Sequence, residues 1–193
     1  MLKLTPNNKW VQDNGNDVHL IITGGEPLLG WQRAYEELIS NPGMRDLRNI
    51  TFETNGTQKI HKSFRDFLLA WQQPALGEKK THEVTFSVSA KLSASGEQWE
   101  EAICPDIVAS YQELGTVYLK FVVETEEHFA EVERAVEEFR AGGFKGVVYV
   151  MPQGGVVTPY AANRVRVADW ACSRGYYYSP RLHVDLWGNG WGK

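Results

Sequence analysis

Two short polar segments contain residue types that could bind a cofactor. The first consists of Thr23, Gly24, Gly25, Glu26 and Pro27. Glycine permits positive φ and lets a ligand approach the main chain closely. A carboxylate beside such a backbone can accept a hydrogen bond from an ammonium or a hydroxyl group. The segment therefore predicts either a binding loop for a cationic ligand or an ordinary strand-to-helix turn, in which Glu26 stabilises the helix dipole.

The second segment, ETNGT at residues 53–57, combines an acid with a turn signal. Asn55 and Gly56 form a strong turn dipeptide. Glu53 directly follows an apolar run, where a carboxylate is costly unless it has a partner. A ribose diol would be a suitable partner, and a solvated turn is the alternative interpretation.

The elements that must position these segments alternate along the chain. Apolar runs rich in β-branched residues predict strands at residues 19–23, 49–54, 83–89, 116–124 and 146–152. Helical spacing predicts helices at residues 31–40, 63–73, 97–114 (interrupted by Pro105), 126–143 and 161–175. This alternation is typical of an α/β protein with a mostly parallel sheet. The near-continuous apolar runs favour strands covered on both faces, and ligands are expected at the carboxyl ends of the strands.

Composition limits the possible functions. The chain has 193 residues and a net charge of -4, which favours neither nucleic acid nor an anionic membrane as a partner. No apolar run approaches the roughly 20 residues needed to span a bilayer. Cys104 and Cys172 are the only cysteines and predict free thiols in a cytoplasmic protein. Residues 1–18 are predicted to form a polar N-terminal arm or remnant, and residues 19–193 a single domain.

Further segments at the predicted strand ends extend the pattern. After TGGEPLL and ETNGT come SVSAKLS, KFVV, VMPQGG and SPRLHVDLWGNGWGK, the last of which closes the chain. Together and in this order they resemble the radical S-adenosylmethionine superfamily, and within it the 7-carboxy-7-deazaguanine synthase family. In one departure, Ala90 stands where the family has the proline of an S-P-K-L-S segment. The resemblance implies a partial (βα) TIM-like barrel of the radical SAM type, with the first βα unit missing.

The resemblance also implies roles for particular residues. Eight positions match the family's contacts to S-adenosylmethionine. Gly24, Gly25 and Glu26 match the contacts to its amino acid end, and Glu53 matches the contact to its ribose, with Asn55 shaping the adjacent turn. Ser89 and Lys91 match positions along the cavity, and Gln153 matches a position near the adenine. Lys91 could instead be a surface lysine. Lys120 lies within an apolar strand, needs a partner, and is predicted to face the barrel interior near the cofactor carboxylate.

Two positions match contacts to the pterin substrate, 6-carboxy-5,6,7,8-tetrahydropterin. They are Thr23 and His183, and a structural role is the alternative for the histidine. The family reaction is a radical ring contraction with loss of ammonia, a carbon–nitrogen lyase step in queuosine biosynthesis. It uses a 4Fe–4S cluster and Mg²⁺ in addition to S-adenosylmethionine.

The sequence departs from the superfamily at the cluster. Three cysteines in a C-x-x-x-C-x-x-C segment hold the cluster in that superfamily, and Cys104 and Cys172 do not match it. The cluster ligands and the Mg²⁺ contact are therefore expected outside this chain, as in a fragment or a split gene, with a second polypeptide supplying them. Without that supply the chain is expected to be inactive. The alternative is a non-catalytic module that binds S-adenosylmethionine, a nucleoside or a pterin, and the family suggests a homodimer.

Overall fold

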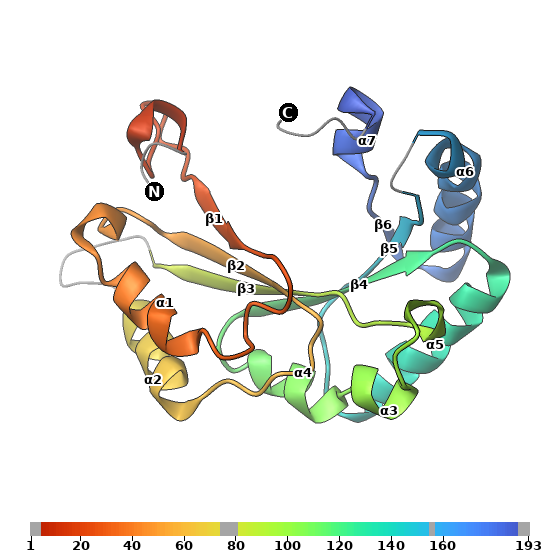
Figure 1. The fold of residues 1–193 in the computed structure, drawn as a ribbon, viewed down its shortest axis with the longest axis horizontal. Helices are drawn as coiled ribbons and strands as arrows, with labels where there is room; N and C mark the ends of the chain where they lie inside the picture. The colour runs from red at the N-terminus through yellow and green to blue at the C-terminus, as the bar shows by residue number, and fades with distance from the viewer. Residues whose placement is uncertain (1–4, 74–80, 155–156, 189–193) are drawn as a thin grey trace.

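The computed structural model describes residues 5–73, 81–154 and 157–188 of the chain. These residues form one six-stranded sheet in which every pair of neighbours is parallel. Its strands, in spatial order, are β1 (His19–Ile22), β2 (Asn49–Thr54), β3 (Glu83–Val88), β4 (Thr116–Val123), β5 (Val148–Pro152) and β6 (Tyr177–Tyr178). Spatial order equals sequence order, as in a (βα) barrel, but the sheet is open (Figure 1). The predicted α/β partial barrel is thus confirmed.

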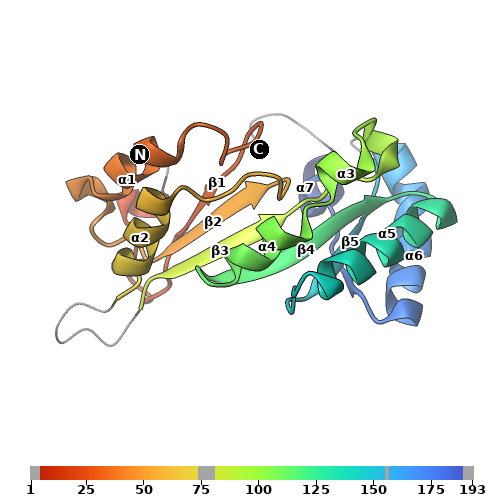
Figure 2. The ribbon, with the colours of Figure 1, turned by 90° about the horizontal axis from the view of Figure 1, so that it is seen from below.

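Helices connect the strands and cover the convex side of the curved sheet (Figures 1 and 2). They are α1 (Gln32–Ile39), α2 (Lys62–Trp71), α3 (Trp99–Ala102), α4 (Pro105–Tyr111), α5 (Glu126–Ala141) and α6 (Val157–Arg174). Helix α7 (Leu182–Trp187) follows β6 and does not cover the convex side (Figure 1). Short 3₁₀ turns lie at η2 (Pro6–Asn8), η3 (Pro42–Met44) and η4 (Ser93–Ser95). The third predicted helix is two helices, because Pro105 begins α4. Both β6 and α7 lie beyond the last predicted helix.

Alternate residues of each strand point to opposite faces of the sheet, and only one face is covered. Phe52, Phe86, Leu119 and Phe121 are fully buried on the face that the helices cover. The prediction that both faces are covered is wrong, since Val122, on the opposite concave face, is 37% exposed. The strand sequences read as continuously apolar because tyrosine and valine also occupy positions on the concave face. The concave face is therefore available to a ligand.

Aromatic contacts fix the covered side of β2 and β3. The Phe52 and Phe86 rings stack at 5.6 Å, and Phe86 stacks on Tyr111 of α4 at 4.6 Å. Phe64 of α2 meets Phe52 edge-on at 5.8 Å. Such pairs add to the free energy gained by burying the rings. They hold β2 and β3, whose ends carry the ETNGT and SVSAKLS segments, against two helices.

The described part of the N-terminal arm is anchored to the domain. Val11 and Asp17 form an antiparallel bridge, and Trp10 is buried with its Nε1 donating to the Gly43 carbonyl oxygen at 2.7 Å. Residues 1–4 lie outside the described part of the chain, as do 189–193 of the closing segment and Gly155 of VMPQGG. Among the described helices, none is long and apolar enough to span a membrane.

We predict that Gly115→Ala destabilises the sheet. A Cβ at residue 115 would lie 2.1 Å from the Val84 carbonyl oxygen of β3, so the two backbones must separate. We expect a loss of about 2–3 kcal/mol in the free energy of unfolding, the cost of overpacking, measured by urea denaturation. In the control Gly96→Ala the Cβ enters open space, and only the positive φ of +81° costs energy, roughly 1 kcal/mol. Equal losses for the two variants would contradict the prediction.

Candidate functional site

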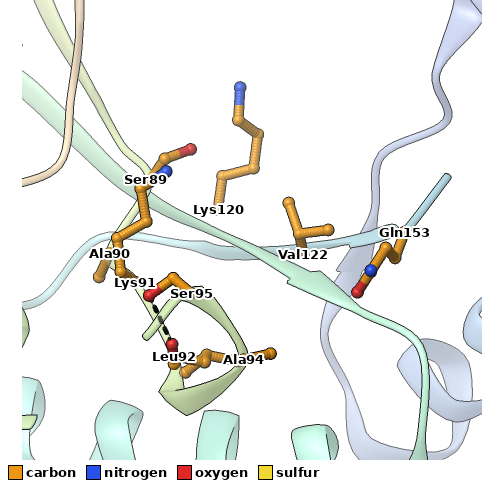
Figure 3. A pocket seen from close by; sticks show the side chains of 9 residues that line it. All are labelled: Ser89, Ala90, Lys91, Leu92, Ala94, Ser95, Lys120, Val122 and Gln153. Carbon is orange, nitrogen blue, oxygen red and sulfur yellow. Dashed lines mark hydrogen bonds between the residues drawn. The ribbon is translucent and has the colours of Figure 1, made fainter. Parts of the chain in front are cut away.

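A cavity of about 230 Å³ opens on the concave face at the carboxyl ends of β3, β4 and β5. Figure 3 shows its lining, in which the Lys120 side chain extends from β4 between Ser89 and Val122. The lining consists of Ser89, Ala90, Lys91, Leu92, Ala94, Ser95, Lys120, Val122 and Gln153. The structure thus brings together three of the predicted cofactor residues, Ser89, Lys91 and Gln153, with Lys120 beside them.

Backbone hydrogen bonds continue the parallel ladder into the segments that line the cavity. The Ser89 amide donates to the Thr54 carbonyl oxygen at 2.7 Å, and the Gln153 amide donates to that of Val123 at 2.8 Å. Further along, the Ser93 amide donates to Glu131 of α5 at 3.0 Å. The main chain on two sides of the cavity is therefore tied to the sheet and to α5.

Lys120 and Glu53 form an ion pair on the concave face. Lys120 Nζ donates to Glu53 Oε1 at 3.3 Å, and the two side chains are 19% and 39% exposed. The pair provides both the partner that a mostly buried lysine needs and the partner that an acid at a strand end needs. Lys120 does face the interior of the curved sheet, and its observed partner is a carboxylate of the chain itself.

The glycine loop has the backbone conformation that its sequence predicts. Gly24 and Gly25 have φ values of 99° and 54°, and a Cβ on either would meet no atom within 4 Å. Side chains are therefore excluded here by conformation, and open space adjoins both residues. A ligand can approach this main chain, as the sequence indicates.

Glu26 joins the loop after β1 to the loop after β2. Its Oε1 accepts hydrogen bonds from the Leu28 amide at 3.0 Å and from Thr54 Oγ1 at 2.7 Å. Its Oε2 accepts one from the Asn55 amide at 2.7 Å. The helix-dipole alternative is wrong, because α1 begins only at Gln32 and has no acid in its first turn. With about four acceptor sites on a carboxylate, three protein donors leave room for one ligand donor.

The ETNGT turn is fixed by its own side chains. Asn55 Oδ1 accepts from the Thr57 amide at 3.0 Å and from Thr57 Oγ1 at 2.8 Å. Below the turn, burial and, to a smaller extent, the Glu26 charge hold the pKa of Tyr111 well above its ordinary value. The Tyr111 hydroxyl stays protonated and donates to the Gln58 carbonyl oxygen. Through its two hydrogen bonds with Thr57, Asn55 therefore shapes the turn that follows the end of β2, the strand that carries Glu53.

The two predicted substrate contacts lie at opposite edges of the sheet. Thr23 is exposed directly after β1, and His183 is exposed on α7, which follows β6. Asp185 holds α7 by accepting from Tyr160 Oη and from Arg164 Nη1, each at 2.9 Å. The structure does not bring Thr23 and His183 together, but β1, which Thr23 follows, and α7, which carries His183, flank the same concave face (Figure 1).

Ser87 is a residue of this face that the sequence does not single out. It lies in register between Glu53 of β2 and Tyr118 of β4 and is fully buried. Its Oγ has no hydrogen-bond partner among the residues that the structure describes. A buried polar atom without a partner is uncommon and needs a physical explanation. Only the alternation of residues along β3 could have placed Ser87 beside the ion pair.

Comparison with known proteins identifies several relatives. The chain is similar to the 7-carboxy-7-deazaguanine synthases of Halobacterium salinarum (33% identical over 190 residues, 92% of this chain and 68% of that protein) and Pyrobaculum aerophilum (30% over 175 residues, 91% and 68%). It is also similar to that of Rhodopirellula baltica (28% over 175 residues, 89% and 62%). No family model matches the chain.

Among solved structures, Streptococcus suis SuiB bound to S-adenosylmethionine is similar over 89% of this chain and 42% of its own, with 16% identity and a TM-score of 0.48. A likeness at this level does not bear on the function of the chain.

We predict that Glu26→Ala destabilises the protein because it leaves the Leu28 amide, Thr54 Oγ1 and the Asn55 amide without an acceptor. Hydrogen bonds to charged groups are individually strong, so we expect a loss of about 2–4 kcal/mol in the free energy of unfolding. Chemical denaturation measures it, and Glu37→Ala, at an exposed position of α1, is the control. A loss no larger than that of the control would show that the three hydrogen bonds do not stabilise the fold.

Proposed function

The chain belongs to the 7-carboxy-7-deazaguanine synthase family, and on this premise we propose that it binds S-adenosylmethionine and a pterin substrate on its concave face. The reaction proposed is the radical ring contraction of 6-carboxy-5,6,7,8-tetrahydropterin to 7-carboxy-7-deazaguanine, with loss of ammonia, in queuosine biosynthesis. Two relatives support the proposal that this chain has the family's activity: they are 30% and 33% identical to it, and the chain covers 68% of the length of each. The observation that carries the proposal is the cavity at the strand ends, which gathers Ser89, Lys91 and Gln153.

The residues at the strand ends fit S-adenosylmethionine in their chemistry. Its ammonium would meet the open main chain at Gly24 and Gly25 and the remaining acceptor site of Glu26. Its ribose hydroxyls would meet the Glu53 carboxylate, which Lys120 Nζ contacts at 3.3 Å. Its remaining polar groups would meet the cavity residues Ser89, Lys91 and Gln153. When bound, this cofactor would supply radical chemistry for hydrogen abstraction from the substrate, given an electron from a donor outside these residues.

The residues do not fit the metal groups that the family reaction also uses. No group of three His, Cys, Asp or Glu side chains within residues 5–73, 81–154 and 157–188 could hold a metal ion. Cys104 precedes α4 and Cys172 is exposed on α6, so the two lie on separate helical segments. We therefore derive no step through an iron–sulfur cluster or Mg²⁺, and propose that cysteines outside these 193 residues, such as those of a second polypeptide, supply the cluster ligands.

The substrate is proposed to lie across the concave face between the two edges of the sheet. Thr23 offers a hydroxyl from the β1 edge, and His183 offers an imidazole from α7 beyond β6. A flat pterin carries donors and acceptors along its edges, so groups on two sides of it would fix its orientation. A homodimer, which the family suggests, is a further part of this proposal.

Two measurements on the isolated chain test the proposal. In anaerobic reconstitution with iron and sulfide, we expect no stable cluster spectrum from this chain alone, because three suitably spaced thiolates are lacking. Addition of a polypeptide with a C-x-x-x-C-x-x-C segment should give the cluster and, with S-adenosylmethionine, reductant and substrate, the product detected by mass spectrometry. Cys104→Ser with Cys172→Ser is the control and should behave in the same way.

Contrary outcomes separate the parts of this proposal. A stable cluster on the chain alone, lost in the double serine variant, would contradict the proposed source of the cluster. Binding of S-adenosylmethionine without product in the reconstituted mixture would instead indicate a non-catalytic binding module.

A further inference from the structure

The Glu53 carboxylate, proposed above to bind a ligand, depends on one side chain for its orientation. Among the described residues its only hydrogen-bond partner is Lys120 Nζ, at 3.3 Å from Oε1. Glu26, by contrast, accepts three hydrogen bonds. Glu53 is 39% exposed, so packing alone does not hold its side chain in one rotamer. Whatever fixes this carboxylate must therefore act largely through Lys120.

The ion pair spans a strand that lies between its two members. Glu53 is on β2 and Lys120 on β4, and β3 separates them in the sheet. The register pairs Glu53 with Ser87 and Ser87 with Tyr118, two residues before Lys120. All four side chains are therefore on the concave face, and Lys120 must reach back over β3 to meet Glu53.

The burial of Ser87 supports this arrangement. Ser87 is fully buried although it lies on the face that no helix covers. Its neighbours on the same face, which include Glu53 in register on one side and Tyr118 on the other, must cover it. The ion pair is thus packed against the sheet, in keeping with the 19% exposure of the Lys120 side chain.

Lys120 also lines the cavity together with Ser89, Lys91 and Gln153. It stands between that cavity and Glu53, and it engages only one of the two carboxylate oxygens. Glu53 Oε2 has no donor among the residues described, so it can accept from a ligand hydroxyl while Oε1 stays on the lysine. In this geometry the Lys120 ammonium holds one carboxylate oxygen of Glu53, and the other oxygen can accept a hydrogen bond from a ligand.

We propose that Lys120 is a positioning residue that orients the Glu53 carboxylate toward the hydroxyl groups of the bound ligand. The inference rests on the proposed function for the role of Glu53 as a ligand contact. It goes beyond that proposal because it assigns Lys120 an effect through Glu53, where the sequence suggested a contact with the cofactor carboxylate. The alternative, an ion pair that serves only stability, predicts no special dependence of ligand binding on Lys120.

Calorimetric titration with S-adenosylhomocysteine, an analogue that needs no cluster chemistry, tests the inference. The variants are Lys120→Met, Glu53→Gln, the double variant and Lys120→Arg. Lys62→Met is the matched control, since Lys62 pairs with Asp66 on the surface. We expect Lys120→Met to weaken binding about tenfold, with no further loss when Glu53→Gln is already present. Lys120→Arg should restore most of the affinity, and Lys62→Met should not change it.

The remaining outcomes are distinguishable. Unchanged binding by Lys120→Met, with loss in Glu53→Gln, would overturn the inference alone. An equal loss from Lys120→Met in the presence and absence of Glu53→Gln would also overturn it, since the lysine would then contact the ligand directly. No binding by the unsubstituted chain, or full binding by Glu53→Gln, would overturn the ligand role of this site and the inference with it. Unfolding curves and a crystal structure of the Lys120→Met variant, in which Glu53 should change rotamer, separate misfolding from misorientation.

Discussion

A parallel sheet that is covered on one face only is the constraint on which the site depends. The helices bury Phe52, Phe86, Leu119 and Phe121, and because strands alternate, every intervening residue must face the concave side. Ser87 and Lys120 are on that side for this reason, and so is Glu53. The free energy gained by burying the apolar residues of the covered face thus places these polar groups on the other face, where no apolar core is needed to position them.

The strand ends add a second level of order, since loops at the edge of a sheet need their own hydrogen bonds to hold one conformation. Glu26 ties the first two loops together, and the amides of Ser89 and Gln153 extend the ladder beyond β3 and β5. The main chain around the cavity is therefore ordered before any ligand arrives. Preorganisation of this kind reduces the entropic cost of binding.

Much of this fold could be predicted from sequence, and the failures have physical causes. Periodicity located β2 at its observed bounds of Asn49–Thr54 and indicated the helix break at Pro105. It missed β6, which is only two residues long, and it did not detect the open concave face, because Tyr118 and Val122 count as apolar wherever they point. Propensity cannot distinguish a tyrosine that packs in a core from one that lines a ligand surface.

The two acids at the strand ends show where local sequence reasoning stops. Glu26 and Glu53 both follow apolar strands and both precede turn residues, so their neighbours in the sequence do not show how many acceptor sites each carboxylate keeps for a ligand. The difference arises from strands distant in sequence: β2 and its turn bring two of the three donors to Glu26, while β4 brings a single lysine to Glu53. An acid whose acceptor sites are mostly occupied holds loops together. An acid held by one cation keeps acceptor capacity for a ligand, so the tertiary fold decides which chemistry each carboxylate can perform.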